Sequence, residues 1–459
     1  MKEINLKKYK KHFKGYTELR LQENKQVNIS FVNGSNKNNI QDSSAGVSAR
    51  VNQNGAWGFA STPGTSRNDV KNIINEAQKN ASFLARRKKT KKELNKKYNG
   101  RGDWDYSTAK PRLSQKELVQ FMQKLDNHIE QKYTKLKSRS LFLNTLDMEK
   151  RLLTSESQVS YSLFPRSFIY VKLSNEKNGE KFEITDSFGG LGHFEDNFSE
   201  PADLYSEINE LYNHLMKKRE GVYAEAGSCE CILDSELAGI LAHEAFGHTV
   251  EADLVKSGSV AETYMNKKVA APAVSMIDYA NKAFGETCPV PVHVDDEGIQ
   301  ARDTVIIEDG ILKSYMHNRE TAREFDAEPT GHGRAFSFSD EPLIRMRNTA
   351  ILPGEHTLSE MISSIEDGYY LIRPSNGQAD STSEFMFGII LGYEIKNGKL
   401  GRAIRDTTIS GVAVDVLQSV SMISDDITWI SSGMCGKKQS IPVGLGGPAV
   451  KCRVNLGGR

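Results

Sequence analysis

The chain has 459 residues, and its 60 lysines and arginines against 59 aspartates and glutamates give a formal net charge of +1. This length predicts two or three domains, and the near-neutral charge argues against a chain-wide binder of polyanions. No apolar run approaches the ~20 residues of a membrane span, and the N-terminus lacks the apolar stretch of a secretory signal. We therefore expect a cytoplasmic protein that makes no use of a membrane.

The first part of the chain predicts strands followed by helices. Alternating residues indicate strands at 26–33, 46–52, 57–61, 158–163 and 168–172. Apolar residues at helical spacing indicate three helices, which begin near Ser66, near Ser114 and after Pro201. We expect these elements to form an N-terminal α/β domain over residues 1–220.

A basic run extends from Arg86 to Lys97 at the end of the first predicted helix. Clustered cations can bind phosphate backbones, but no aromatic platform or helix-turn-helix pattern accompanies these. We expect a solvated helix end and a linker, and no nucleic-acid partner.

Glycines, short strands and turn signals become frequent after about residue 220. Strand candidates lie at 291–295, 304–307, 311–316, 387–395 and 407–410, and one clear helix runs from Ser235 to about Val255. We expect a strand-rich C-terminal domain over residues 221–459.

That one helix carries the residues most indicative of chemistry, in the segment DSELAGILAHEAFGHTVEADLV at 234–255. His243 and Glu244 precede His248 in an H-E-x-x-x-H pattern. Two neighbouring imidazoles can bind one metal ion, and a carboxylate between them can take a proton from water. The pattern therefore indicates a hydrolytic metal site.

The spacing of these two histidines makes a structural demand. In the common zinc motif the histidines are four residues apart, which separates them by about 40° around the helix. A spacing of five residues separates them by about 140° on a regular helix, which is too far for one ion. The helix must contain a π-bulge or a break between them, and Gly247 is suited to either.

A catalytic zinc site takes a third protein ligand and leaves one position for water. The candidates are Glu251 and Asp253 just downstream, and Cys435 in the segment GMCGKKQSIPVG. The glycines beside Cys435 allow its backbone to approach another element closely, and the two lysines that follow it favour a thiolate. The residues alone leave the choice open.

Several segments together resemble the TldD/PmbA metallopeptidase family, on its metal-bearing TldD branch. They follow one another through most of the chain, most clearly from about residue 225 onward. The main ones are ILAHEAFGHTVEADL, VDDEGI at 294–299, IEDGILKSYMHNRETA at 307–322, PTGHGR at 329–334 and MCGKKQSIPVGLGGPAV at 434–450.

The resemblance implies a zinc-dependent peptidase that hydrolyses peptide bonds in short or unfolded polypeptides. It assigns His243, His248 and Cys435 as ligands of one Zn²⁺ per metal-bearing subunit and Glu244 as the general base, and it leaves the substrate-binding residues unassigned. It also implies a homodimer, or a heterodimer with a homologous metal-free subunit, that admits extended chains.

The expected fold class is therefore α+β: an N-terminal α/β domain, then a strand-rich C-terminal domain that carries one metal-binding helix. The C-terminal sheets are expected to be mixed or antiparallel, with a barrel as one arrangement. One departure from the family pattern is His332, which stands in PTGHGR where asparagine is more familiar. His332 could be an extra ligand, but we expect a loop residue that contacts backbone.

Two other functions fit the same residues. A non-catalytic binding partner, or a modulator of DNA topology acting on gyrase, would use the fold for binding alone. A metal amidase that acts on a non-peptide amide would share every residue named above.

Overall fold

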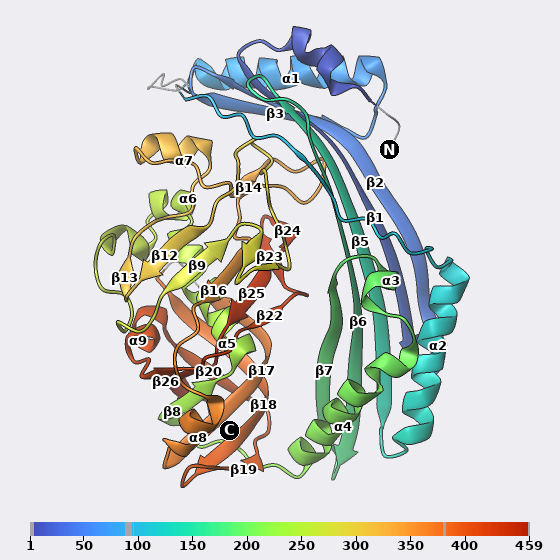
Figure 1. Ribbon diagram of the computed structural model, residues 1–459, viewed down its shortest axis with the longest axis vertical. Coiled ribbons are helices and arrows are strands. Elements are labelled where there is room, and N and C mark those ends of the chain that lie inside the picture. The colour runs from blue at the N-terminus through green and yellow to red at the C-terminus, as the bar shows by residue number, and fades with distance from the viewer. Residues whose placement is uncertain (1–3, 88–93, 95, 380–381, 458–459) are drawn as a thin grey trace.

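The computed structural model describes residues 4–87, 94, 96–379 and 382–457. Figure 1 shows two units side by side, a tall N-terminal sheet with its helices and a C-terminal unit rich in shorter strands. Strands dominate both units and helices cover them, which confirms the predicted α+β class. The division at residue 220 stays a prediction, although N-terminal and C-terminal strands belong to separate sheets.

The N-terminal sheet consists mainly of long antiparallel strands in the order β3-β2-β1-β5-β6, and the far side of β6 pairs with β7 and, in parallel, with β4. These strands are β1 (Tyr16–Val32), β2 (Ser35–Gln53), β3 (Ala56–Thr62), β4 (Asp103–Asp105), β5 (Ser138–Thr154), β6 (Ser160–Lys177) and β7 (Glu180–Leu191).

Several of these strands are much longer than the predicted ones because tight turns join them directly. Asn33 and Gly34 link β1 to β2 with φ angles of 49° and 82°. Asn178 and Gly179 link β6 to β7 with φ angles of 55° and 81°. Such pairs of left-handed residues form hairpin turns whose twist matches the strands, so the pairing runs to the turn itself.

Helices cover one face of this sheet. The helices are α1 (Arg67–Ala85), α2 (Gln115–Lys132), α3 (Phe194–Asn197) and α4 (Tyr205–Arg219). The sequence predicted helices that begin near Ser66 and Ser114, and these serines cap α1 and α2, each in a reciprocal capping box. Leu19 and Leu21 of β1 pack in the cluster beneath α1, and Ile29 and Phe31 pack in the cluster beneath α2 and α4.

The opposite face is polar and yet buried, because the C-terminal unit packs against it. Glu18, Arg20, Gln22 and Asn24 alternate with the apolar residues of β1, and each is at most 4% exposed. The side-chain amides of Gln22 and Asn24 both donate to the carbonyl of Phe336, at 2.6 and 2.7 Å. Buried polar groups need such partners, so this face specifies where the C-terminal unit sits.

Arg50 of β2 is the centre of the charged part of this contact. Its guanidinium lies 2.5 Å from Glu297, 2.9 Å from Glu341 and 3.5 Å from Glu18. Arg50, Glu18 and Glu297 are all at least 95% buried. One cation thus stabilises two buried carboxylates, one from each unit.

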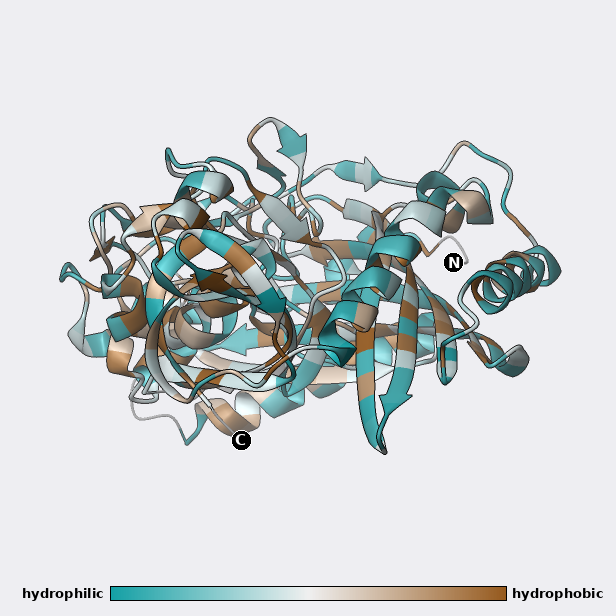
Figure 2. Ribbon diagram, turned by 90° about the horizontal axis from the view of Figure 1, so that it is seen from below, coloured by the Kyte–Doolittle hydropathy of each residue, from teal (hydrophilic) through white to brown (hydrophobic). Residues whose placement is uncertain are grey.

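The C-terminal unit contains a closed five-stranded barrel, seen nearly end-on in Figure 2, so the barrel arrangement is the observed one. The strands run in the order β17-β8-β26-β20-β18, and β18 pairs back with β17. They are β8 (Gly227–Leu233), β17 (Asp367–Ala379), β18 (Glu384–Lys396), β20 (Thr407–Val412) and β26 (Val450–Leu456), with β19 (Lys399–Ala403) and β21 (Met422–Ile423) attached.

A second sheet lies beside the barrel in the order β13-β12-β9-β16-β25-β22. Its strands are β9 (Met276–Tyr279), β12 (Thr304–Glu308), β13 (Ile311–Leu312), β16 (Asn348–Ile351), β22 (Thr428–Ile430) and β25 (Gly444–Gly447). The hairpins are β10 (Lys282–Ala283) with β11 (Glu286–Thr287), β14 (Gly333–Arg334) with β15 (Leu343–Ile344), and β23 (Met434–Lys437) with β24 (Gln439–Pro442).

Short helices complete the unit: α5 (Ser235–Ile240), α6 (Ala252–Lys256), α7 (Arg319–Glu324), α8 (Leu358–Ser363) and α9 (Ala413–Gln418). The helix predicted from Ser235 to Val255 is interrupted, as the spacing of its two histidines required: α5 leads into a π-helical segment, Leu241–Gly247, and then a short 3₁₀ turn before α6. Apolar side chains of α5 and the π segment share one core with the barrel and the second sheet.

Two predicted strands also differ from the structure. Residues 291–295 form no strand, and a single bridge at Val294 is their only ladder contact among the described residues. Of 311–316, only Ile311–Leu312 is a strand. Both stretches contain apolar residues that are buried within loops, and burial alone does not distinguish such loops from strands.

Within the described ranges, every helix is too short or too polar to cross a bilayer. The middle of the basic run, residues 88–93 and 95, lies outside the described residues.

We expect Arg50→Met to lower the free energy of unfolding by about 3–5 kcal/mol, because it leaves Glu18 and Glu297 buried without their shared cation. Urea unfolding measures this loss. As a control, Lys79→Met removes an exposed ion pair with Glu76 and should change stability by less than about 1 kcal/mol. Equal effects of the two substitutions would contradict the role given to Arg50.

Candidate metal centre

The two histidines of the H-E-x-x-x-H pattern lie on a locally widened helix, as their spacing required. The backbone N–H of His248 donates to the carbonyl of His243, five residues earlier, which is the bond of a π-helix. The wider turn brings the two rings to the same side, with their centroids 5.1 Å apart.

Gly247 allows the π-helical segment to pack closely against Met346. A β-carbon at that position would lie 2.4 Å from the sulfur of Met346 and 2.9 Å from the carbonyl oxygen of Ala242. Real β-carbons do not approach other atoms so closely, so the segment packs against β15–β16 only because residue 247 has no side chain.

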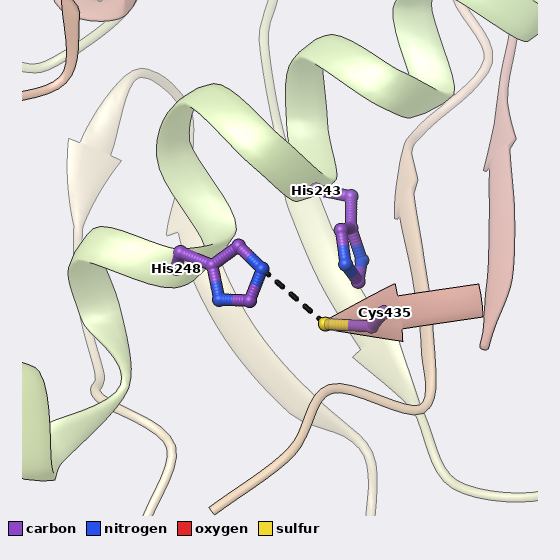
Figure 3. Close-up of side chains that lie close together, drawn as sticks. All are labelled: His243, His248 and Cys435. Atoms are coloured by element: carbon purple, nitrogen blue, oxygen red, sulfur yellow. Dashed lines mark hydrogen bonds between the residues drawn. The ribbon is translucent and has the colours of Figure 1, made fainter. Parts of the chain in front are cut away.

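Cys435 reaches the histidines from near the other end of the chain. Figure 3 shows both imidazoles on the helical ribbon and the thiol on β23, all directed into one space. The sulfur lies 3.3 Å from Nε2 of His248, and one donor atom of each residue lies within 4.8 Å of the others. Of the third-ligand candidates, the structure brings Cys435 to the histidines.

A buried arginine holds the hairpin that carries Cys435. The guanidinium of Arg345, which is fully buried, donates to the carbonyls of Cys435 and Gln439 at 2.5 and 2.6 Å. These carbonyls lie on the two facing strands, β23 and β24. Arg345 therefore fixes the position of the Cys435 thiol through the backbone of the hairpin.

The donor set fits a metal ion by its unused groups as well as by its distances. His243 is 1% exposed, and neither of its ring nitrogens has a hydrogen-bond partner among the described residues. Leaving a buried polar group unpaired costs free energy, and a metal ligand would recover that cost. Two imidazoles and a thiolate form a donor set well suited to zinc.

The charge of Cys435 also suits this role. Burial alone would raise the pKa of its thiol, but the imidazoles of His243 and His248 outweigh burial and lower the pKa to about 5. The group is therefore a thiolate at neutral pH, and the thiolate is the form that binds metals. The lysines that follow Cys435 are not the cause that the sequence suggested.

One of those lysines acts on a carboxylate instead. Glu251, which is fully buried, accepts from Nδ1 of His248 and from Nζ of Lys437, each at 3.0 Å. Burial opposes ionisation of Glu251, yet His248 and Lys437 hold its pKa at about 2. The bond to Nδ1 orients the His248 ring so that Nε2 faces Cys435.

The other candidate ligands lie outside the cluster. Asp253 bonds to Lys437 at 2.8 Å. His332 is fully buried between Asp278 and Thr330, with contacts of 2.9 and 2.7 Å, so its partners are side chains and not the loop backbone that we expected.

Glu244 lies at the solvent side of the cluster. Its side chain is 31% exposed, and its oxygens lie 3.6 Å from Nε2 of His248 and 3.9 Å from Nε2 of His243. A carboxylate in this place can exchange a proton with a small molecule held next to the three donors.

Sequence reasoning missed Arg345 and the part that Glu251 plays. Arg345 lies in no recognised motif, and only the folded hairpin brings carbonyls to it. Glu251 did carry a signal, because it follows His248 by three residues, the spacing at which helical side chains meet.

Two models of one protein family match the chain. The model of PmbA/TldA metallopeptidase domain 1 matches residues 17–81, and the model of the C-terminal domain of the same family matches residues 226–458.

Individual relatives and a solved structure agree with these models. The chain is 31% identical to a metalloprotease of Methanocaldococcus jannaschii, with 98% of each chain covered, and 29% identical to the zinc metalloprotease TldD homolog of Saccharolobus solfataricus, with 90% of each covered. The crystal structure of TldE from Thermococcus kodakarensis superposes with a TM-score of 0.76 at 18% identity and 99% coverage of both chains, which supports the fold. The chain therefore belongs to the PmbA/TldD family and is a metallopeptidase.

Proposed function

We propose that this metallopeptidase is a zinc enzyme that hydrolyses peptide bonds in short or unfolded polypeptides. The observation that carries the proposal is the convergence of Cys435 on two histidines, one of which has both ring nitrogens buried and unpaired. A protein that used this fold for binding alone would have no need of so costly an arrangement.

His243, His248 and Cys435 would hold one Zn²⁺ in each metal-bearing chain. Bound zinc would supply a Lewis acid, which makes water acidic and polarises a carbonyl group. Three protein donors leave room for a water and a substrate oxygen, as in catalytic zinc sites.

Glu244 is the general base in this proposal. Its carboxylate takes a proton from the attacking water and gives it to the amine that leaves when the peptide bond breaks. Its partial exposure and its place beside both histidines support the role. A non-peptide amide would require the same groups, so the choice of peptide rests on the family.

The proposed substrate is an extended chain, because His243 is buried and access is from the side of Glu244. We also propose a dimer in the cytoplasm, either of two such chains or with a homologous metal-free subunit.

We expect the purified protein to contain about one zinc per chain and to cleave a fluorogenic unfolded peptide. Removing the metal with a chelator should abolish cleavage, because the Lewis acid is lost, and added Zn²⁺ should restore it. Metal analysis and initial rates measure both effects. Full activity in a preparation free of metal would refute the proposed function.

We expect Glu244→Gln to keep its zinc and to lose at least about 100-fold in cleavage rate, because the amide cannot accept the proton. The measurements are zinc content and kcat for the same peptide. Glu262→Gln, at an exposed glutamate, is the control and should cleave at the normal rate. Normal cleavage by Glu244→Gln would exclude Glu244 as the base.

We expect Glu251→Gln to weaken zinc binding by about 10–100-fold, because the amide no longer holds His248 with a negative charge. Competition with a chromophoric chelator measures the affinity. Asp253 also contacts Lys437. Asp253→Asn leaves Glu251 in place, so it should weaken zinc binding much less. Equal losses in the two variants would show that Lys437 alone is responsible.

A further inference from the structure

A cavity lies between the two units, apart from the metal donors. We call it the inter-unit pocket. The N-terminal sheet forms one side of it, and C-terminal loops with the end of β24 form the other. Its principal lining residues are Trp104, Lys150, Phe164, Arg166, His293 and Arg334.

Arg166 of β6 is the unusual residue in this pocket. It is only 5% exposed, and its Nε has no hydrogen-bond partner among the described residues. Among the described residues, the guanidinium donates one hydrogen bond, to the carbonyl of Ser431, and the ring of Phe168 lies 5.0 Å away. Burial lowers the pKa of Arg166 to about 10, so it stays a cation at neutral pH.

The carboxylates that also line the pocket are engaged elsewhere. Asp296 lies 2.7 Å from Lys150 and 3.5 Å from Arg20. Asp295 accepts backbone N–H groups, including that of Gly333 at 2.9 Å. In the part of the chain that the structure describes, no ion pair joins Arg166 to either of them. A buried cation without a counter-charge is costly, and an added carboxylate would offset that cost.

A second lining arginine, Arg334, also lacks an ion-pair partner among the described residues. The guanidinium of Arg334 donates to the carbonyls of Met346 and Pro442 and makes no ion pair with a described residue. The pocket therefore holds more positive than negative charge. In its side wall, the rings of Trp104 and His293 stack 4.6 Å apart and 2° from parallel.

The pocket adjoins the metal centre through the backbone. Ser431, which accepts from Arg166, precedes Cys435 by four residues, and four residues span at most about 14 Å. Pro442, on the pocket side, follows Ile441, which pairs with Cys435 across the hairpin. An extended peptide rises about 3.3 Å per residue, so a few residues of substrate are enough to cover a span of this maximum length.

We propose that the inter-unit pocket binds a carboxylate of the peptide substrate, through Arg166, a few residues from the bond that is cleaved. The inference rests on the proposed peptidase function. The carboxylate is either an acidic side chain or the free C-terminus of the substrate, since both present the same pair of oxygens to a guanidinium. The enzyme would thus favour substrates that carry a negative charge at one fixed position.

The test compares unfolded fluorogenic peptides that differ only by Glu or Gln at each of several positions around the cleaved bond. A second series compares free with amidated C-termini at increasing peptide length. We expect one position, or one length, at which the carboxylate raises kcat/KM by about tenfold in the zinc-loaded enzyme. The first series identifies a side chain as the source, and the second identifies the chain end.

Arg166→Met should bring this ratio close to one, because the loss in kcat/KM falls mainly on the charged peptide. Arg151→Met is the matched control, because Arg151 lies on β5 between the lining residues Lys150 and Leu152 but does not line the pocket. Its ratio should equal that of the unmodified enzyme. Zinc content and thermal unfolding of each variant show whether the contact with Ser431 has been needed for folding.

Three results would overturn the proposal: no carboxylate preference in the unmodified enzyme, a preference that survives Arg166→Met, or equal losses on charged and uncharged peptides. Fluorescence anisotropy with the zinc-loaded Glu244→Gln chain measures the same preference as binding, without cleavage. Failure of all cleavage would refute the peptidase function, whereas loss of the binding preference alone would refute the pocket.

Discussion

The number of residues between His243 and His248 is the constraint on which the centre depends. On a regular helix the two rings would diverge, and the five-residue hydrogen bond between them turns them to one side. A helix does not widen without support, and here the core of the barrel and the second sheet encloses the segment. The missing side chain at Gly247 lets Met346 pack where a β-carbon would collide.

In the N-terminal sheet, the two faces of one strand are buried against different parts of the molecule. On β1, residues such as Leu19 and Leu21 pack under helices, while Arg20 and Gln22 bond to the C-terminal unit. An apolar second face would bury as much surface but would bind the other unit in many ways. Buried polar groups require specific partners, so this face accepts one arrangement. That arrangement also forms the walls of the inter-unit pocket.

The sequence predicted the parts of the structure that depend on local residues. Helices begin at Ser66 and Ser114, where apolar residues at helical spacing follow, and the deformation between the histidines followed from arithmetic alone. The strand lengths were not predicted, because exposed polar stretches of β2 conceal its alternation. Residues 291–295 were misjudged because loops buried between two units are as apolar as strands.

The third ligand was a harder problem for sequence reasoning. The residues alone left Cys435, Glu251 and Asp253 as candidates, although the two acids lie nearer to the histidines in the chain, and the resemblance to the family favoured the cysteine. Physical reasoning could not exclude the two acids, because Lys437, which engages both, reaches them only through the fold. The role of Arg166 could not be predicted for the same reason, because its lack of a counter-charge depends on the residues that surround it in the fold.

The wide separation of the donors along the chain has a consequence for synthesis. Residues 243 and 248 leave the ribosome long before residue 435. Arg345 has no carbonyl groups of the hairpin to bind until both β23 and β24 have been synthesised. An unfinished polypeptide therefore lacks the sulfur that the proposed metal centre requires. Assembly of the proposed centre is thus coupled to synthesis of the hairpin formed by β23 and β24.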